Sequence, residues 1–343
     1  MAASRRPVSG SPTSCCGQDL AFLPAGAEAS PDNWIMVSPS DILVVVPPPL
    51  PTRPDWTAGA VFGFIGPNGA GKTTTLRLLL ALQRPTRGEA RLWGQVVRPG
   101  AKVLRDVGAL VERPGFYPYL SGRRNLLLFA AARGLRGPEA SDAVQVALES
   151  VDMTGPASRP VGGYSTGMQQ RLAIGLASLG DPRLVILDEP TAGLDPDGVI
   201  AVRALVGRLA AHGTTVFLST HLLNEAEQLC SHIGLLSRGQ LIAYGQRDEL
   251  LVGQEVRVVR FDSPDDLHRA LQVLQDSGVT AEALDERACK VSTSESGRAL
   301  SERLAAAGAY PSEIAPQRRT LEDLYREISR HASEVANASG RVA

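Results

Sequence analysis

Short apolar runs alternate with stretches of helical periodicity between residues 60 and 250. Three of the runs are AVFGFI at 60–65, LVILD at 184–188 and TTVFLST at 214–220. Amphipathic patterns such as GMQQRLAIGLASL at 167–179 and VIAVRALVGRLAAH at 199–212 lie between or after them. Short buried strands separated by helices are typical of a mostly parallel sheet covered by helices. We therefore expect an α/β domain over residues 58–250.

The pattern changes after residue 250. The segment predicts the order strand, helix, strand, strand, helix, strand, which is the ferredoxin-like split βαβ order. The expected strands span 256–262, 281–285, 288–294 and 311–316, and the expected helices span 265–278 and 296–308. A closing helix should begin after Thr320, a suitable N-cap. We expect a small α+β accessory domain over 251–343.

The first 57 residues carry ten of the 24 prolines, including PPPLP at 47–51. Proline interrupts helices and removes a backbone donor, so this segment should be irregular. No apolar run in the sequence approaches the roughly 20 residues that a membrane-spanning helix requires. Arg5 and Arg6 are followed by Ser, Pro and Thr with no apolar stretch before Cys15, so a signal peptide is not expected.

Composition narrows the functional classes. With 43% hydrophobic and 21% charged residues, the chain can bury a sizeable core. A net charge of −1 argues against nucleic acid as a partner. Cysteines 15, 16, 230 and 289 fit no metal-ligand spacing, so reduced thiols are expected.

The segment GPNGAGKTT at 66–74 follows an apolar strand and opens a helix, as in a P-loop. Its glycines let backbone N–H groups surround a phosphate, Lys72 can reach the β- and γ-phosphates, and Thr73 offers a hydroxyl to Mg²⁺. The residues predicted to bind ATP here are Gly66, Pro67, Asn68, Gly69, Ala70, Gly71, Lys72, Thr73 and Thr74.

Two acids close the strand LVILD and a histidine closes TTVFLST. Asp188 should hold Mg²⁺ near the phosphates, because that ion prefers oxygen ligands. Glu189 should orient or deprotonate the attacking water, and His221 should contact the γ-phosphate. An N-cap with a surface acid, or a structural histidine, is the alternative interpretation of these residues.

The segment GGYSTGMQQRLAIGLASLGDPRLVILDEPTAGLDP at 162–196, with the P-loop and His221, resembles the ATPase subunit of an ABC transporter over about 59–250. In that family YSTGM at 164–168 is the signature motif, with Ser165 and Gly167 forming a second phosphate site at a helix start. The resemblance also implies that Asp195 is the D-loop aspartate and His221 the switch histidine. Thr166 and Met168 replace the more usual glycine and glutamine of the signature.

Two phosphate-binding ends on one fold imply a head-to-tail dimer, with each ATP held between one P-loop and the opposite signature. The resemblance further implies ATP hydrolysis with Mg²⁺ for transport, and a separate transmembrane permease. That partner would hold the chain at the cytoplasmic face of the cell membrane.

Glu112 lies where most members carry the Q-loop glutamine, and an acid here is similar to the bacitracin- and lantibiotic-export subgroup. A carboxylate can still serve Mg²⁺ or water, so Glu112 is both a catalytic and a metal-binding candidate. The aromatic residues Phe116, Tyr117 and Tyr119 would receive the permease, or would cap the core of the helical subdomain.

The sequence departs from the family before the P-loop. Members normally stack an aromatic residue on adenine, yet the sequence holds none from Met36 to Asp55, and Trp34 and Trp56 are the nearby candidates. Two alternatives to an exporter ATPase stay open, a subunit impaired in hydrolysis and a non-transport ABC ATPase.

The C-terminal region is also similar to the tails of many export-type members, which regulate the ATPase or help it to dimerise.

Overall fold

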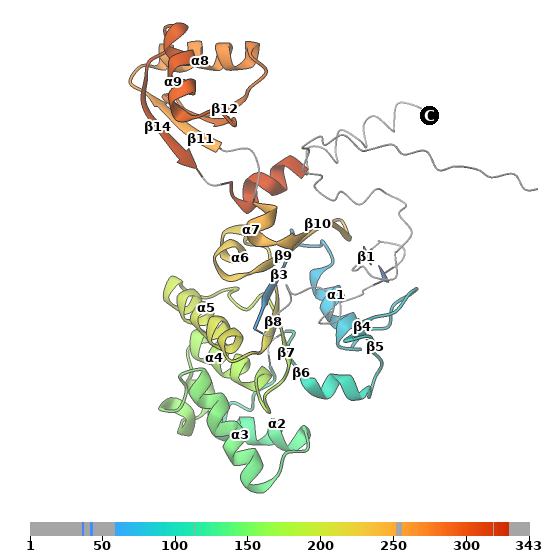
Figure 1. Ribbon diagram of the computed structural model, residues 1–343. Coiled ribbons are helices and arrows are strands. Elements are labelled where there is room, and N and C mark those ends of the chain that lie inside the picture. The colour runs from blue at the N-terminus through green and yellow to red at the C-terminus, as the bar shows by residue number, and fades with distance from the viewer. Residues whose placement is uncertain are drawn as a thin grey trace, which may run out of the picture.

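A six-stranded sheet forms the centre of the computed structural model, which describes residues 59–112, 114–251, 256–317 and 319–328, and the backbone of 36–37 and 42–43. Five neighbouring strands run parallel, and β10 pairs antiparallel at one edge (Figure 1). In spatial order the strands are β10 (Gln240–Gln246), β9 (His232–Ser237), β3 (Val61–Ile65), β8 (Thr215–Thr220), β7 (Leu184–Asp188) and β6 (Val107–Leu110). The predicted mostly parallel sheet is confirmed.

Strand β3 shows why the sheet needs helices on both faces. All five of its residues are buried. Phe62 and Phe64 pack in one hydrophobic cluster, while Val61 and Ile65 pack in another. Because side chains alternate along a strand, these clusters lie on opposite faces of the sheet.

Helix α1 (Lys72–Leu79) covers the face of Phe62 and Phe64. The other face is covered chiefly by α4 (Thr166–Ala177) and α5 (Pro196–Ala211), which Figure 1 shows across the sheet from α1. The remaining elements of this part are β4 (Arg91–Leu92), β5 (Gln95–Val96), η1 (Lys102–Asp106), α2 (Gly122–Ala132), α3 (Gly137–Ser150), η2 (Pro156–Ser158), η3 (Val161–Gly163), α6 (Leu223–Leu229) and α7 (Arg247–Leu250).

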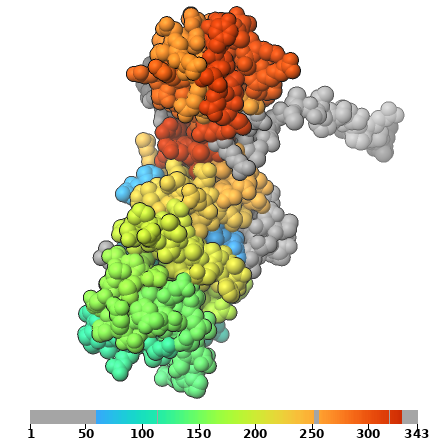
Figure 2. All heavy atoms as spheres, turned by 90° about the vertical axis from the view of Figure 1, so that its left-hand side faces the viewer, coloured from blue at the N-terminus to red at the C-terminus, as the bar shows by residue number. Residues whose placement is uncertain are grey.

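The C-terminal region forms a separate four-stranded antiparallel sheet with its own core. The predicted order of elements is the one observed, and the strands lie in the order β12-β13-β11-β14. Its assignment to the ferredoxin-like class stays a prediction. The elements are β11 (Val256–Phe261), α8 (Pro264–Asp276), β12 (Thr280–Asp285), β13 (Ala288–Ser292), α9 (Gly297–Ala306) and β14 (Pro311–Gln317). Figure 2 shows this region at the opposite end of the molecule from α2 and α3.

A closing helix spans residues 321–328 and returns to the core of the first sheet. Its Leu321 and Leu324 are fully buried there. The Thr320 hydroxyl accepts a hydrogen bond from the Asp323 N–H at 3.3 Å, and the Asp323 carboxylate accepts one from the Thr320 N–H at 3.0 Å. Thr320 is therefore the predicted cap, in a reciprocal arrangement. The apolar face of the helix packs in the core of the first sheet, while its Asp323 pairs with Lys290 of the C-terminal sheet.

At the other end of the chain, β1 (Met36–Val37) pairs with β2 (Ile42–Leu43). The expectations for Trp34, Trp56, Cys15 and Cys16 lie outside the described residues. Cys230 and Cys289 are buried and free, and burial raises the pKa of Cys230 to about 12 and that of Cys289 to about 11. Among the described residues, no helix has both the length and the apolar character needed to span a bilayer.

Candidate nucleotide-binding site

The P-loop joins the central strand β3 to helix α1. Gly69 and Gly71 have positive φ values of 80° and 103°, which favour glycine. A Cβ on Gly66 would lie 2.4 Å from the Leu236 carbonyl oxygen of β9, so this position also requires glycine. The loop residues Pro67, Asn68 and Gly69 are exposed. The sequence therefore forms an open backbone turn at a helix start, as predicted.

Lys72 is almost fully buried at the first position of α1. Its Nζ donates to the carbonyl oxygens of Gly66 at 2.8 Å and Pro67 at 3.3 Å. The same atom lies 3.3 Å from Glu189 Oε1. The ammonium group thus lies within the loop and links it to the end of β7.

Thr73 and Asp188 meet beside the lysine. The Thr73 hydroxyl donates to Asp188 Oδ2 at 2.8 Å, and the Ser219 hydroxyl donates to Asp188 Oδ1. A hydroxyl and a carboxylate in contact fit the preference of Mg²⁺ for oxygen ligands from one or two side chains. Ser219 was not among the predicted site residues, although a serine at the end of a strand with a buried, mostly apolar pattern was a usable signal.

Glu189 has a positive φ of 45°, which is uncommon outside glycine. Its N–H donates to the Ser219 hydroxyl at 3.0 Å and to the Ser219 carbonyl at 3.1 Å, which hold this backbone. One carboxylate oxygen faces Lys72, and the other lies 3.1 Å from His221 Nδ1. The structure therefore brings Lys72, Glu189 and His221 together at the carboxyl ends of three neighbouring strands.

Ser165 and Asp195 are N-caps of helices that pack away from the P-loop. Ser165 accepts from the Met168 N–H at 3.3 Å at the start of α4, and Asp195 accepts from the Gly198 N–H at 2.9 Å at the start of α5. Gly167 lies inside the first turn of α4 rather than before it. Both helices cover the sheet face opposite α1, so the chain does not bring these caps to its own Lys72.

Glu112 pairs with Arg77, whereas Thr73 and Asp188 pair with each other. The Glu112 side chain is 66% exposed. Arg77 follows Thr73 by one helical turn on the same face of α1. The acid thus lies along the edge of the site, and its predicted metal role stays a prediction.

The aromatic residues after Glu112 divide into two kinds. Phe116 is partly buried and packs edge-on against Phe129 beside the core, which agrees with the second interpretation, a cap on the core of the helical subdomain. Tyr117 and Tyr119 are 47% and 72% exposed. The buried Asn125 amide, which the sequence analysis missed, holds this loop by accepting from the Tyr117 N–H at 2.8 Å and donating to the Tyr117 carbonyl at 3.1 Å.

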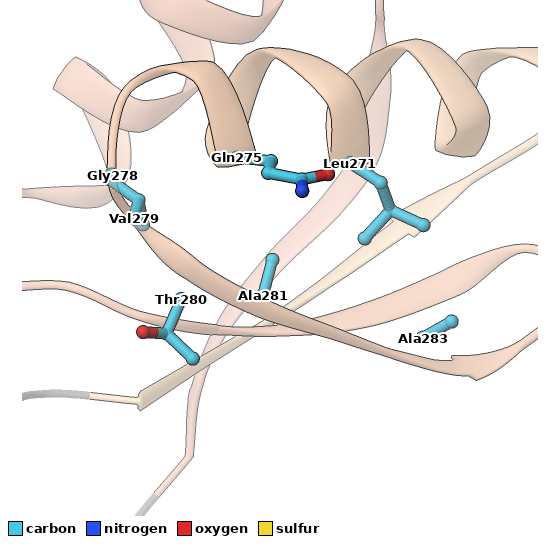
Figure 3. Close-up of a pocket in the computed structure, with 7 residues that line it drawn as sticks. All are labelled: Leu271, Gln275, Gly278, Val279, Thr280, Ala281 and Ala283. Carbon is cyan, nitrogen blue, oxygen red and sulfur yellow. The ribbon is translucent and has the colours of Figure 1, made fainter.

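Two cavities lie away from the P-loop. One of about 560 Å³ lies between α8 and β12 in the C-terminal domain (Figure 3). Its lining residues are Leu271, Gln275, Gly278, Val279, Thr280, Ala281 and Ala283. None of them carries a charge, so this cavity does not suit a triphosphate. The other, of about 370 Å³, lies beside Glu112, Phe129 and Arg133.

Comparison with known proteins agrees with this geometry. The family model described as "ABC transporter" matches residues 54–192. A daunorubicin resistance ATP-binding protein of Streptomyces coeruleorubidus is 35% identical over 288 residues, which cover 82% of this chain and 90% of that protein. The chain belongs to the ABC transporter ATP-binding protein family. The family resemblance inferred from the sequence is therefore confirmed.

Two further similarities refine the comparison. The bacitracin transport ATP-binding protein of Bacillus licheniformis is 45% identical over 186 residues, which cover 54% of this ABC protein and 60% of that relative. This chain therefore spans about three fifths of that relative's length. The solved structure of cbiO1 from Clostridium perfringens, part of the ABC transporter complex cbiONQ, covers 56% of this chain and 79% of its own, with a TM-score of 0.51 and 26% identity. That likeness supports the P-loop ATPase fold.

Proposed function

We propose that this ABC protein binds and hydrolyses ATP to energise a membrane exporter. Residues 58–250 would form the ATPase domain and the region from 251 an accessory domain, with the closing helix packed back on the former. The proposal rests on one observation: the Glu189 carboxylate contacts both Lys72 and His221. Two relatives are named for bacitracin transport and daunorubicin resistance, which supports export.

Lys72 would bind the β- and γ-phosphates, because its ammonium group already lies inside the loop that they would fill. Phosphate oxygens would then compete with Glu189 for the lysine. A Glu189 carboxylate released from Lys72 keeps its contact with His221 and can orient water or accept its proton. His221 would hold that carboxylate and contact the γ-phosphate.

Thr73 and Asp188 would hold Mg²⁺, since they present adjacent oxygen atoms beside Lys72. When bound, the ion neutralises charge on the phosphate oxygens. Ser219 would keep Asp188 oriented through its other oxygen. Glu112 would join this group as its ion pair with Arg77 opens, because Arg77 lies one turn beyond Thr73.

A second copy of the chain completes the proposed site. The starts of α1 and α4 belong to helices on opposite faces of one sheet. ATP held by one P-loop would therefore reach Ser165 and Gly167 of a second copy, with Asp195 near the same interface. Capped helix starts suit the phosphates of ATP because their free N–H groups carry partial positive charge.

The membrane partner would be a separate permease at the cytoplasmic face. Tyr117 and Tyr119 expose aromatic area on a loop braced by the fully buried Asn125. Exposed aromatic residues on a rigid support are typical interface anchors.

ATP turnover with Mg²⁺ tests the proposed function. The full chain should hydrolyse ATP, Asp188→Asn should not, and Asp142→Asn on the exposed face of α3 should match the parent. ATP binding without turnover in the parent would favour the impaired-subunit interpretation. Turnover without co-purification of any membrane permease would favour a non-transport ABC ATPase.

A further inference from the structure

Helix α6 connects the site to the C-terminal part of the chain. It begins two residues after His221 and carries two glutamates that accept hydrogen bonds from different parts of the chain. Glu225 accepts a hydrogen bond from the Thr191 hydroxyl at 2.6 Å. Glu227 accepts one from the backbone N–H of Leu321 at 3.1 Å, at the start of the closing helix. Residues two apart point to different sides of a helix, so α6 lies between these two partners.

Helix α6 is held by these two hydrogen bonds and by the packing of Ala226 in the core. The helix has seven residues and no side-chain cap. A helix of this length is only marginally stable by itself, because its few hydrogen bonds do not offset the free-energy cost of forming the first turn. Thr191 follows Glu189 by two residues, so the same short helix is attached to both ends of the Glu189–His221 contact.

The closing helix offers a rigid support for Glu227. Leu321, Leu324 and Ile328 bury its apolar face in the core that also contains Ala226 of α6. At its N-terminus a carboxylate is favourable, since the first N–H groups of a helix have no partner within it. Asp323, in its first turn, pairs with Lys290 of β13 and thus ties the helix to the C-terminal sheet.

We propose that Glu227 is a positioning residue that couples the C-terminal domain to hydrolysis. By holding α6 on the closing helix, it keeps His221 against Glu189. Phosphate binding by the P-loop does not use this connection, because α1 packs on the other face of the sheet. The inference rests on the proposed function, and it assigns the accessory domain a role in turnover rather than in ATP affinity.

The test compares Glu227→Ala with Glu227→Gln in the full chain. Alanine removes the acceptor for Leu321, whereas the glutamine oxygen preserves it. Glu249→Ala, an exposed glutamate on the neighbouring helix α7, is the matched control. We expect kcat of Glu227→Ala to fall about tenfold with KM for ATP unchanged, and Glu227→Gln and the control to stay near the parent.

Hydrogen–deuterium exchange supplies a readout that needs no turnover. In Glu227→Ala, exchange should rise over residues 221–229 and stay at the parental level over 66–79. Unchanged exchange at 221–229, an equal loss of ATP affinity and kcat, or failure of glutamine to restore kcat would overturn the inference. A parent that hydrolyses no ATP would instead refute the proposed function, and exchange alone would then decide whether Glu227 positions α6.

Discussion

Lys72 Nζ lies 3.3 Å from Glu189 Oε1, so the predicted phosphate-binding lysine and the predicted base form one ion pair. The lysine is nearly buried, whereas the glutamate stays partly exposed. Binding of phosphate to Lys72 and release of Glu189 should therefore be coupled. This relationship suggests separate tests of the two residues.

Replacing Lys72 with alanine should weaken ATP binding about 10- to 150-fold, because a charged donor to the phosphates is lost. Titration of the purified chain with ATP measures this. Lys102→Ala, which changes an exposed lysine on η1, should bind like the parent. Equal affinity of Lys72→Ala and the parent would remove Lys72 from the phosphate site.

Replacing Glu189 with glutamine should preserve ATP binding but lower turnover at least about 100-fold, since the amide cannot accept the proton of water. A size-exclusion column with ATP and Mg²⁺ should then show a lasting dimer. Glu282→Gln on β12, an exposed position, is the control. Turnover at the parental rate would exclude Glu189 as the base.

Replacing Ser219 with alanine should raise the Mg²⁺ concentration needed for half-maximal turnover about 10- to 100-fold. The variant removes the hydroxyl that orients Asp188 and accepts the Glu189 N–H. Ser277→Ala, which alters an exposed serine at the end of α8, should leave the requirement unchanged. An unaltered Mg²⁺ requirement in Ser219→Ala would contradict a supporting role.

Replacing both Tyr117 and Tyr119 with alanine should release the chain from membranes that contain its permease, with ATP affinity unchanged. Tyr310→Ala, an exposed tyrosine of the C-terminal region, should stay bound. Fractionation measures both. If the double variant stayed on the membranes, Tyr117 and Tyr119 would not form the docking surface.

Replacing Phe116 with alanine should lower the melting temperature, because the variant loses packing against Phe129.

Asp323 should stabilise the chain in a pH-dependent way. Burial raises the pKa of its carboxyl, but hydrogen bonds from Lys290 and Thr320 outweigh this effect and lower the pKa below its usual value. Its contribution to stability is therefore complete above the unfolded pKa of about 3.9 and is lost as pH falls through the folded value. Asp323→Asn should melt about 1–3 °C below the parent at pH 6 to 7, and this gap should close in acid. If the difference in melting temperature did not change with pH, the loss of stability would come from helix capping and not from the charge of Asp323.

Much of the site was predictable because its parts are local. A strand, a glycine-rich turn and a helix follow one another over residues 60–83, so the P-loop could be located from sequence alone. Thr320 was predicted as a cap for the same reason, since a cap and its helix are neighbours in the chain. Sequence left Phe116 open between a docking surface and a cap on the core, because its exposure depends on Phe129 in a later helix.

The sequence by itself determined the class of the main domain, the family and the residue types at the strand ends, since hydrophobic periodicity and short motifs are properties of neighbouring residues. The tertiary structure alone decided which of those residues meet. The parallel register of β7 and β8 sets Asp188 opposite Ser219, and the return of the chain after β14 brings Leu321 to Glu227, 94 residues away. Such contacts depend on the pairing of distant strands and on helix packing, which local pattern does not encode.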